Sequence, residues 1–241
     1  MQRKNAILRA ANHHFGRHGF RGASLRDIAR DAEVSLTLLN HHFGSKFQLL
    51  GAVIDSHREM LDERASAVQK LMADSAGRFT IDELVQVWIR IGFDTAADVD
   101  GEQFLRLMAR VMDDPSEEAA EVVRDKLDDA ALVFIDALQQ CYPGASRYAA
   151  ASTYLYVSAA LVKFLVGSKR LFRLVQAHRP DGLALDGAAH NGAAHNGTAH
   201  NGAALDGATA DAVTRADEAR LTRFLVAGID AALRTPERAP R

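Results

Sequence analysis

Serines interrupt the helical periodicity of apolar residues at three points within the first fifty residues. Ser24, Ser35 and Ser45 each stand directly before a segment of that periodicity, where a serine hydroxyl can accept a hydrogen bond from an unpaired helix N–H group. Gly19 is placed to end the segment before Ser24, because glycine readily adopts the left-handed turn that closes a helix. This part of the chain predicts four helices, over residues 3–18, 25–32, 36–42 and 46–73.

The same periodicity continues toward the C-terminus and predicts an all-α protein. Only five prolines occur in 241 residues, and runs of alternating β-branched residues are scarce. Thr80 and Ser116 are placed to cap further helices. We expect about nine helices in total, the later five covering residues 81–98, 102–113, 117–141, 145–178 and 211–234.

Residues 181–210 differ from the rest, because a five-residue unit opening with Asn-Gly or Asp-Gly repeats across 186–207. These dipeptides form turns, and the segment offers almost no bulky apolar surface to bury. We therefore expect a disordered linker between two helices. His190, His195 and His200 could chelate a transition metal weakly. They lack fixed geometry and carboxylates, so a tandem-repeat expansion is the favoured interpretation, and the role of the repeat stays open.

Charge is distributed unevenly along the chain. Residues 1–50 contain eight Lys and Arg against three Asp and Glu, whereas the remainder contains 21 and 28. A basic N-terminal part on an acidic body is typical of a phosphate-binding module joined to a domain that does not touch nucleic acid. A chance fluctuation of surface charge is the alternative.

The second and third predicted helices are short and are joined by a tight turn, as in a helix-turn-helix. Leu39 and Phe43 fall on the inward face of the third helix, and Thr37, Asn40 and His41 fall on its outward face. A short helix with a polar outward edge can enter a DNA major groove about 12 Å wide.

The amino-acid sequence of this segment resembles that of the DNA-binding domain of TetR/AcrR-type bacterial transcription regulators. The resemblance covers residues 5–50 and rests on Phe15, Gly19, Ser24, Ile28-Ala29, Val34-Ser35, His42-Phe43, Lys46 and Leu49. It implies a DNA-binding domain at residues 1–47 and a helical dimerisation and effector-binding domain at 48–241. Two departures occur, since Glu33 stands where the family usually has glycine and Asn40 where it usually has a phosphate-contacting tyrosine.

The resemblance implies candidate contacts to a double-stranded DNA operator, some to bases and some to phosphates. His42 could instead pack beside Phe43, Ser24 could serve only as a cap, and Arg26 could be a solvated charge. The candidates are Ser24, Arg26, Ser35, Thr37, Leu38, Asn40, His41, His42 and Lys46.

The resemblance also implies a homodimer formed through the last two helices and a pocket for a small apolar or aromatic effector. The alternative for the dimer faces is burial within one chain, and for the pocket residues an ordinary core. The candidate pocket residues are Trp88, Phe93, Phe104, Met108, Met112, Phe134 and Tyr156.

These expectations describe a homodimeric repressor that its ligand releases from a palindromic operator. The alternative is a ligand-independent architectural or cell-cycle partner protein that uses the same DNA-binding domain. The sequence contains no Gly-rich phosphate loop, nucleophile elbow or Cys/His metal grid, so we expect no enzyme, catalytic residue, metal site or cofactor.

Cellular location is predicted from what the sequence lacks. Cys141 is the single cysteine, so an intrachain disulfide is excluded and a reducing compartment is favoured. We find neither a run of about 18 apolar residues nor a signal-peptide core, and therefore expect a cytoplasmic protein without a membrane partner.

Overall fold

The structure is a computed structural model that describes residues 2–167 and 207–234, and every regular element in these ranges is an α-helix. We call α1–α4 the head and the remaining helices the body. The helices are α1 (Gln2–Gly22), α2 (Leu25–Asp31), α3 (Leu36–Phe43), α4 (Lys46–Asp55), α5 (Arg58–Asp74), α6 (Ile81–Ala96), α7 (Val99–Met112), α8 (Glu117–Lys126), α9 (Asp128–Cys141), α10 (Arg147–Val166) and α12 (Gly207–Arg234).

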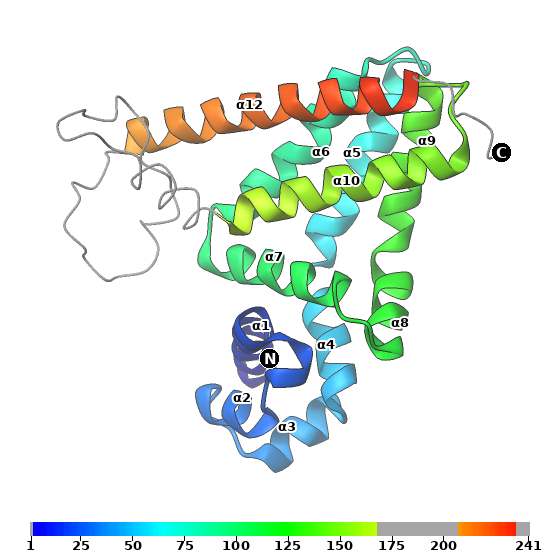
Figure 1. Ribbon diagram of the computed structural model, residues 1–241. Coiled ribbons are helices and arrows are strands. Elements are labelled where there is room, and N and C mark those ends of the chain that lie inside the picture. The colour runs from blue at the N-terminus through cyan, green and yellow to red at the C-terminus, as the bar shows by residue number, and fades with distance from the viewer. Residues whose placement is uncertain (1, 168–206, 235–241) are drawn as a thin grey trace, which may run out of the picture.

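The buried side chains form two cores. One core joins the four head helices to the inner faces of α7 and α8. The other lies among α5, α6, α9, α10 and α12. The head therefore occupies one end of the molecule, while α10 and α12 run side by side across the opposite end, with α7 between them and the head (Figure 1).

The predicted serine caps are confirmed. The Ser24 Oγ accepts from Asp27 N at 3.4 Å, and the Ser35 Oγ accepts from Leu38 N at 3.1 Å. Ser45 forms a reciprocal pair, since its Oγ accepts from Gln48 N at 3.1 Å while its own N–H donates to Gln48 Oε1 at 2.9 Å. Each cap satisfies an N–H group that the helix leaves unpaired, so the helix starts are fixed locally.

Two helices that the sequence predicts as continuous are broken. The predicted helix 46–73 divides at residues 56–57, where the His57 ring stacks on Phe104 of α7 with centroids 4.0 Å apart. The predicted helix 117–141 divides at Leu127, whose φ of −120° departs from helical geometry. The first of these breaks accompanies a contact with a distant part of the chain, which helical periodicity cannot report.

Three helix ends also differ from the prediction. The stretch expected to end a helix at 98–101 begins α7 instead, because the Asp98 carboxylate accepts from Gly101 N at 2.7 Å. The first helix extends to Gly22 through a non-helical Gly19 with φ of 74°. α12 begins at Gly207, earlier than the predicted Asp211.

The predicted linker lies largely outside the described residues. Positions 181–206, the three repeat histidines and the predicted continuation of α10 to 178 all fall there. The described ranges hold eleven helices against the nine predicted for the whole chain, and the two divided helices account for the difference.

The sequence contains no continuous run of about 18 apolar residues, but one helix in the described ranges is long and apolar enough to cross a membrane by length and composition alone. α10 qualifies by length and composition, with a mean hydropathy of 1.5, and 22% of its apolar window is buried. Alanines interspersed with tyrosines and serines raise its mean hydropathy without a continuous apolar run. The helix packs on α6, α7, α9 and α12, as a helix of a folded body does.

Candidate DNA-binding interface

The turn between α2 and α3 keeps a left-handed residue although no glycine stands there. Glu33 has a φ of 55°. Its N–H donates to Arg30 O at 3.0 Å, and the Val34 N–H donates to Ala29 O at 2.9 Å. These two bonds close α2 and hold the turn, so Glu33 accepts a conformation that costs a side-chain-bearing residue free energy.

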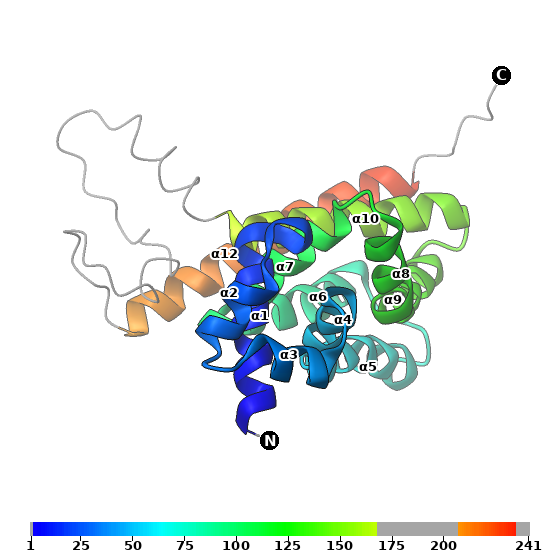
Figure 2. The same ribbon diagram turned by 90° about the horizontal axis from the view of Figure 1, so that it is seen from below.

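α3 is anchored on one face and exposed on the other. Leu39 is fully buried and Phe43 nearly so, as predicted. Thr37, Asn40 and His41 are exposed along the outer edge of the helix. α3 lies at the end of the head that faces away from α10 and α12 (Figures 1 and 2).

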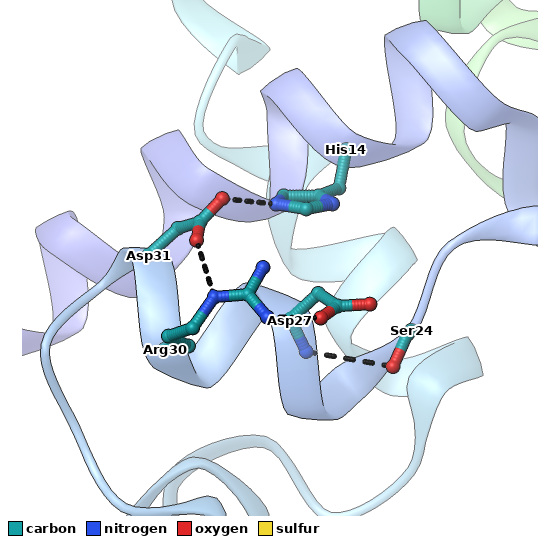
Figure 3. Close-up of polar contacts among 5 residues, drawn as sticks. All are labelled: His14, Ser24, Asp27, Arg30 and Asp31. Atoms are coloured by element: carbon teal, nitrogen blue, oxygen red, sulfur yellow. Dashed lines mark hydrogen bonds and ion pairs between the residues drawn. The ribbon is translucent and has the colours of Figure 1, made fainter.

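A network of polar contacts fastens α2 to α1 (Figure 3). His14 Nε2 lies 2.7 Å from Asp31 Oδ2, and Arg30 donates to Asp31 at 3.2 Å and to Asp27 at 2.6 Å. The hydrogen bond from His14, more than the neighbouring Arg30, holds the pKa of Asp31 below its ordinary value. The network fixes the orientation of α2 and occupies Arg30.

The basic candidates differ in their surroundings. Arg26 is exposed and forms no ion pair with any residue in the described ranges. Lys46 is half-buried, and its Nζ donates to Arg21 O at 3.1 Å and lies 5.0 Å from the Phe20 ring centroid. Partial burial lowers the pKa of Lys46. Lys46 is therefore held in place at the start of α4, whereas Arg26 faces solvent.

The remaining DNA-contact candidates lie on or beside this edge. Ser24 is half-buried and Ser35 is exposed, and both serve as caps. Leu38 is half-buried. His42 is exposed with its ring centroid 6.2 Å from that of Phe43, so it contacts that ring from the outside.

The start of α1 belongs to the same surface, which the prediction of contact residues missed. Gln2, Arg3 and Lys4 line a hollow with His42. The Lys4 Nζ lies 6.0 Å from the Phe43 ring centroid. The excess of basic residues in the first fifty positions was the available signal, but nothing in the sequence placed the start of α1 beside the end of α3.

The structure does not bring the predicted pocket residues together. Trp88, Phe93 and Phe134 lie in the core of the body, where the Trp88 and Phe134 rings are 4.5 Å apart. Phe104 and Met108 lie in the core shared with the head. Met112 is 42% exposed and Tyr156 is 68% exposed. An open hollow of about 760 Å³ beside α5 and α9 is lined by none of them; it is lined by Gln69, Met72, Ala73, Gly77, Gln139, Gln140 and Pro143.

Arg64 is a half-buried cation of the body that was not among the predicted site residues. It follows buried Leu61 by three positions and precedes buried Val68 by four, so helical spacing alone places it on the inner face of α5. Its guanidinium carbon lies 5.0 Å from the Trp88 ring centroid. The helical periodicity of α5 could have indicated Arg64, because it places a charged residue among inward-facing apolar positions.

The predicted dimer faces of α10 and α12 divide into inner and outer sides. Buried side chains of both helices pack within the body, namely Leu161, Leu221, Leu225, Ile229 and Leu233. Large apolar side chains on the outer sides remain exposed, namely Tyr148, Leu155, Tyr156 and Phe224.

Sequence comparisons match both halves of this arrangement. A family model described as "Bacterial regulatory proteins, tetR family" matches residues 7–53. A second, described as "Tetracyclin repressor-like, C-terminal domain", matches residues 89–191. The HTH-type transcriptional regulator BetI of Agrobacterium fabrum is 40% identical over 86 residues, which are 35% of this chain and 40% of BetI. The regulatory protein RaaS of Mycobacterium tuberculosis is 47% identical over 64 residues, 27% of this chain and 30% of RaaS.

These matches cover less than half the length of either relative. The fold is matched over more of the chain. A transcriptional regulator of Rhodococcus sp. Rha1 has a TM-score of 0.56 at 16% identity, covering 98% of both chains. HlyIIR, a hemolysin II transcriptional regulator, has a TM-score of 0.53 at 16% identity, covering 73% of this chain and 96% of its own. From the two family models and this common fold, the chain belongs to the TetR family of bacterial regulatory proteins.

Proposed function

We propose that the chain is a transcription regulator that binds double-stranded DNA as a homodimer and inserts α3 into the major groove. The observation that carries the proposal is the polar outer edge of α3, where Thr37, Asn40 and His41 are exposed while Leu39 anchors the helix. An eight-residue helix held from behind in this way fits a groove about 12 Å wide. Asn40 has the amide geometry that pairs with adenine, and Thr37, Leu38 and His41 complete the candidate base contacts.

Phosphate contacts would surround this edge. The N-termini of α2 and α4 carry Ser24 and Lys46, and helix N-termini favour anions. Arg26 and His42 are exposed nearby, and Arg3 and Lys4 extend the basic surface along α1. Such contacts position a protein on DNA without reading its sequence.

Dimerisation would set the spacing of two heads for a palindromic operator, about 34 Å or a multiple of it. The exposed outer sides of α10 and α12, with Leu155 and Phe224, offer the apolar surface for this contact. They lie at the opposite end from α3, so two chains joined there leave both reading helices free (Figure 1).

Control by a small effector, with release of the protein from DNA, is part of the proposal. Arg64 beside Trp88 supports it, because two of its donors are enclosed without a partner among the described residues, and enclosed donors call for an acceptor. The close packing of Trp88 on Phe134 favours the ligand-independent alternative, since it leaves these rings in contact with each other. Regulation of this kind acts on chromosomal DNA and so places the protein in the cytoplasm, without any enzymatic step.

Gel shifts with the intergenic DNA beside its own gene test the proposal. We expect specific binding that weakens steeply with salt, because phosphate contacts release counterions. Asn40→Ala and His41→Ala should each weaken specific binding about five- to 150-fold, since one lost base contact costs about 1–3 kcal/mol. Gln69→Ala, an exposed amide on α5, is the matched control and should bind as the wild type does.

Two results would refute this function. One is the absence of any salt-sensitive, sequence-specific binding to that DNA or to DNA upstream of neighbouring genes. The other is an Asn40→Ala, His41→Ala double variant that binds as tightly as the Gln69→Ala control.

A further inference from the structure

Arg64 is a half-buried cation whose guanidinium has enclosed and unused hydrogen-bond donors. Its Nε and Nη2 are both buried, and neither has a hydrogen-bond partner among the described residues. The same holds for the indole Nε1 of Trp88, whose ring lies 5.0 Å from the guanidinium carbon. Three N–H donors from α5 and α6 thus lack acceptors within one small region, and leaving buried donors unpaired costs free energy.

The surroundings of Arg64 supply no counter-charge, and the Tyr154 hydroxyl is the one polar group that acts on its charge within the described ranges. On α6, Gly92 lets Arg64 and two leucines of α10 pack closely on its backbone, since a Cβ there would lie 3.3 Å from Arg64 Nη2 and 3.2 Å from Leu161 and Leu165. On α10, Tyr154 completes an aromatic wall, with its ring centroid 5.9 Å from that of Trp88. None of the ion pairs within the described ranges includes Arg64.

The charge itself survives burial. Desolvation lowers the pKa of Arg64 to about 10, which leaves the guanidinium protonated at neutral pH. The Tyr154 hydroxyl, whose own pKa burial raises, is neutral there as well. The region therefore presents a fixed cation walled by aromatic and aliphatic side chains.

We propose that Arg64 anchors an effector site that receives the carboxylate of an apolar organic acid between α5, α6 and α10. Nε–H and Nη2–H form one edge of the guanidinium, and this edge matches the two oxygens of a carboxylate in a bidentate pair. The Trp88 N–H adds a third donor, so the group bound there must be an acceptor. The apolar walls contact the remainder of the ligand. The inference rests on the proposed function for the consequence of binding, but not for binding itself.

The test uses the full chain and two matched pairs of probes, octanoate with octanamide and 4-phenylbutyrate with 4-phenylbutyramide. Trp88 is the only tryptophan, so its fluorescence reports occupancy beside Arg64, and the rise in melting temperature gives a second readout. We expect at least one carboxylate to bind about tenfold or more tightly than its amide. Arg64→Met should abolish this preference. Arg58→Met, which removes an exposed charge of the same helix, should keep it.

Each result decides the proposal. It is overturned if the amides bind as tightly as the acids, if Arg64→Met keeps the preference, or if neither acid binds at up to about 10 mM. Should Arg64→Met not fold, Arg64→Lys replaces it and is expected to retain a weaker preference, because it keeps the charge but loses the bidentate edge. Gel shifts are run separately, so a chain that prefers carboxylates yet binds no DNA would refute the proposed function and leave the site standing.

Discussion

Substituting Gly16 by alanine probes the contact that holds the head on the body. Gly16 lies inside α1 against α7, and a Cβ there would stand 2.6 Å from the backbone oxygen of Gln103. Real Cβ atoms essentially never approach another atom closer than 3.0 Å, so α1 and α7 must move apart. The obstacle is a main-chain atom, which no rotamer change can remove.

The magnitude follows from two opposing terms. Replacing glycine by alanine within a helix stabilises a protein by about 0.5–1 kcal/mol. Forcing an extra methyl group into a packed contact destabilises it by about 1–3 kcal/mol. Arg110 adds to the cost, because its guanidinium donates to Gly16 O at 3.0 Å and to Arg17 O at 3.1 Å, and both bonds span the same contact.

Gly51 gives a matched control, because it lies inside α4 and a Cβ there would meet nothing within 4 Å. Urea unfolding should find Gly51→Ala slightly more stable than the wild type and Gly16→Ala less stable, about 1–3 kcal/mol below the control. Equal stabilities of the two variants would refute the argument that α1 and α7 are packed to their limit.

Two further predictions concern the head and its junction with the body. Glu33→Gly should raise the free energy of unfolding by about 0.5–1 kcal/mol in urea titrations, because the residue has a φ of 55°; a loss of stability would show that the Glu33 side chain contributes more than its backbone strain costs. Burial lowers the pKa of His57 more than Asp100 and Asp98 raise it, so the unfolded chain takes up more protons as pH falls below about 6.5. His57 therefore lowers the free energy of unfolding as the pH falls below that value. The free energy of unfolding of His57→Phe should decrease less than that of the wild type between about pH 7.5 and 5.5. If the free energy of unfolding depended on pH equally in the wild type and in His57→Phe, the role given to His57 would be wrong.

The parts of the fold that depend on neighbouring residues could be predicted from the sequence. The caps at Ser24, Ser35, Ser45 and Thr80 lie where the sequence places them, because a cap needs only a hydroxyl and an N–H two or three residues away. The inward position of Leu39 followed from the spacing of a single short helix.

The parts of the fold that depend on residues distant along the chain could not be predicted from the sequence. Nothing near His57 reports that Phe104, far along the chain, stacks on its ring and accompanies the break between α4 and α5. The sequence placed Phe104 and Trp88 in one candidate pocket set, with an ordinary core as the alternative, and periodicity could not show that they belong to different cores. The predicted pocket set therefore divides between the two cores and the surface.

Ligand binding at Arg64 would change the orientation of α3 through α7. α7 packs on α6 and α10, which flank Arg64, and on α1, where Asn12 Nδ2 donates to Asp100 O at 2.8 Å. α1 in turn holds α2 through His14 and Asp31. Because the contact at Gly16 leaves no free space, α7 cannot shift toward α1 without carrying the head with it. Two changes should therefore disturb the contact between α1 and α7 from opposite sides. One is a ligand that separates α6 from α10, and the other is the Gly16→Ala substitution. A Gly16→Ala variant that binds operator DNA normally would show that the head takes its orientation from elsewhere.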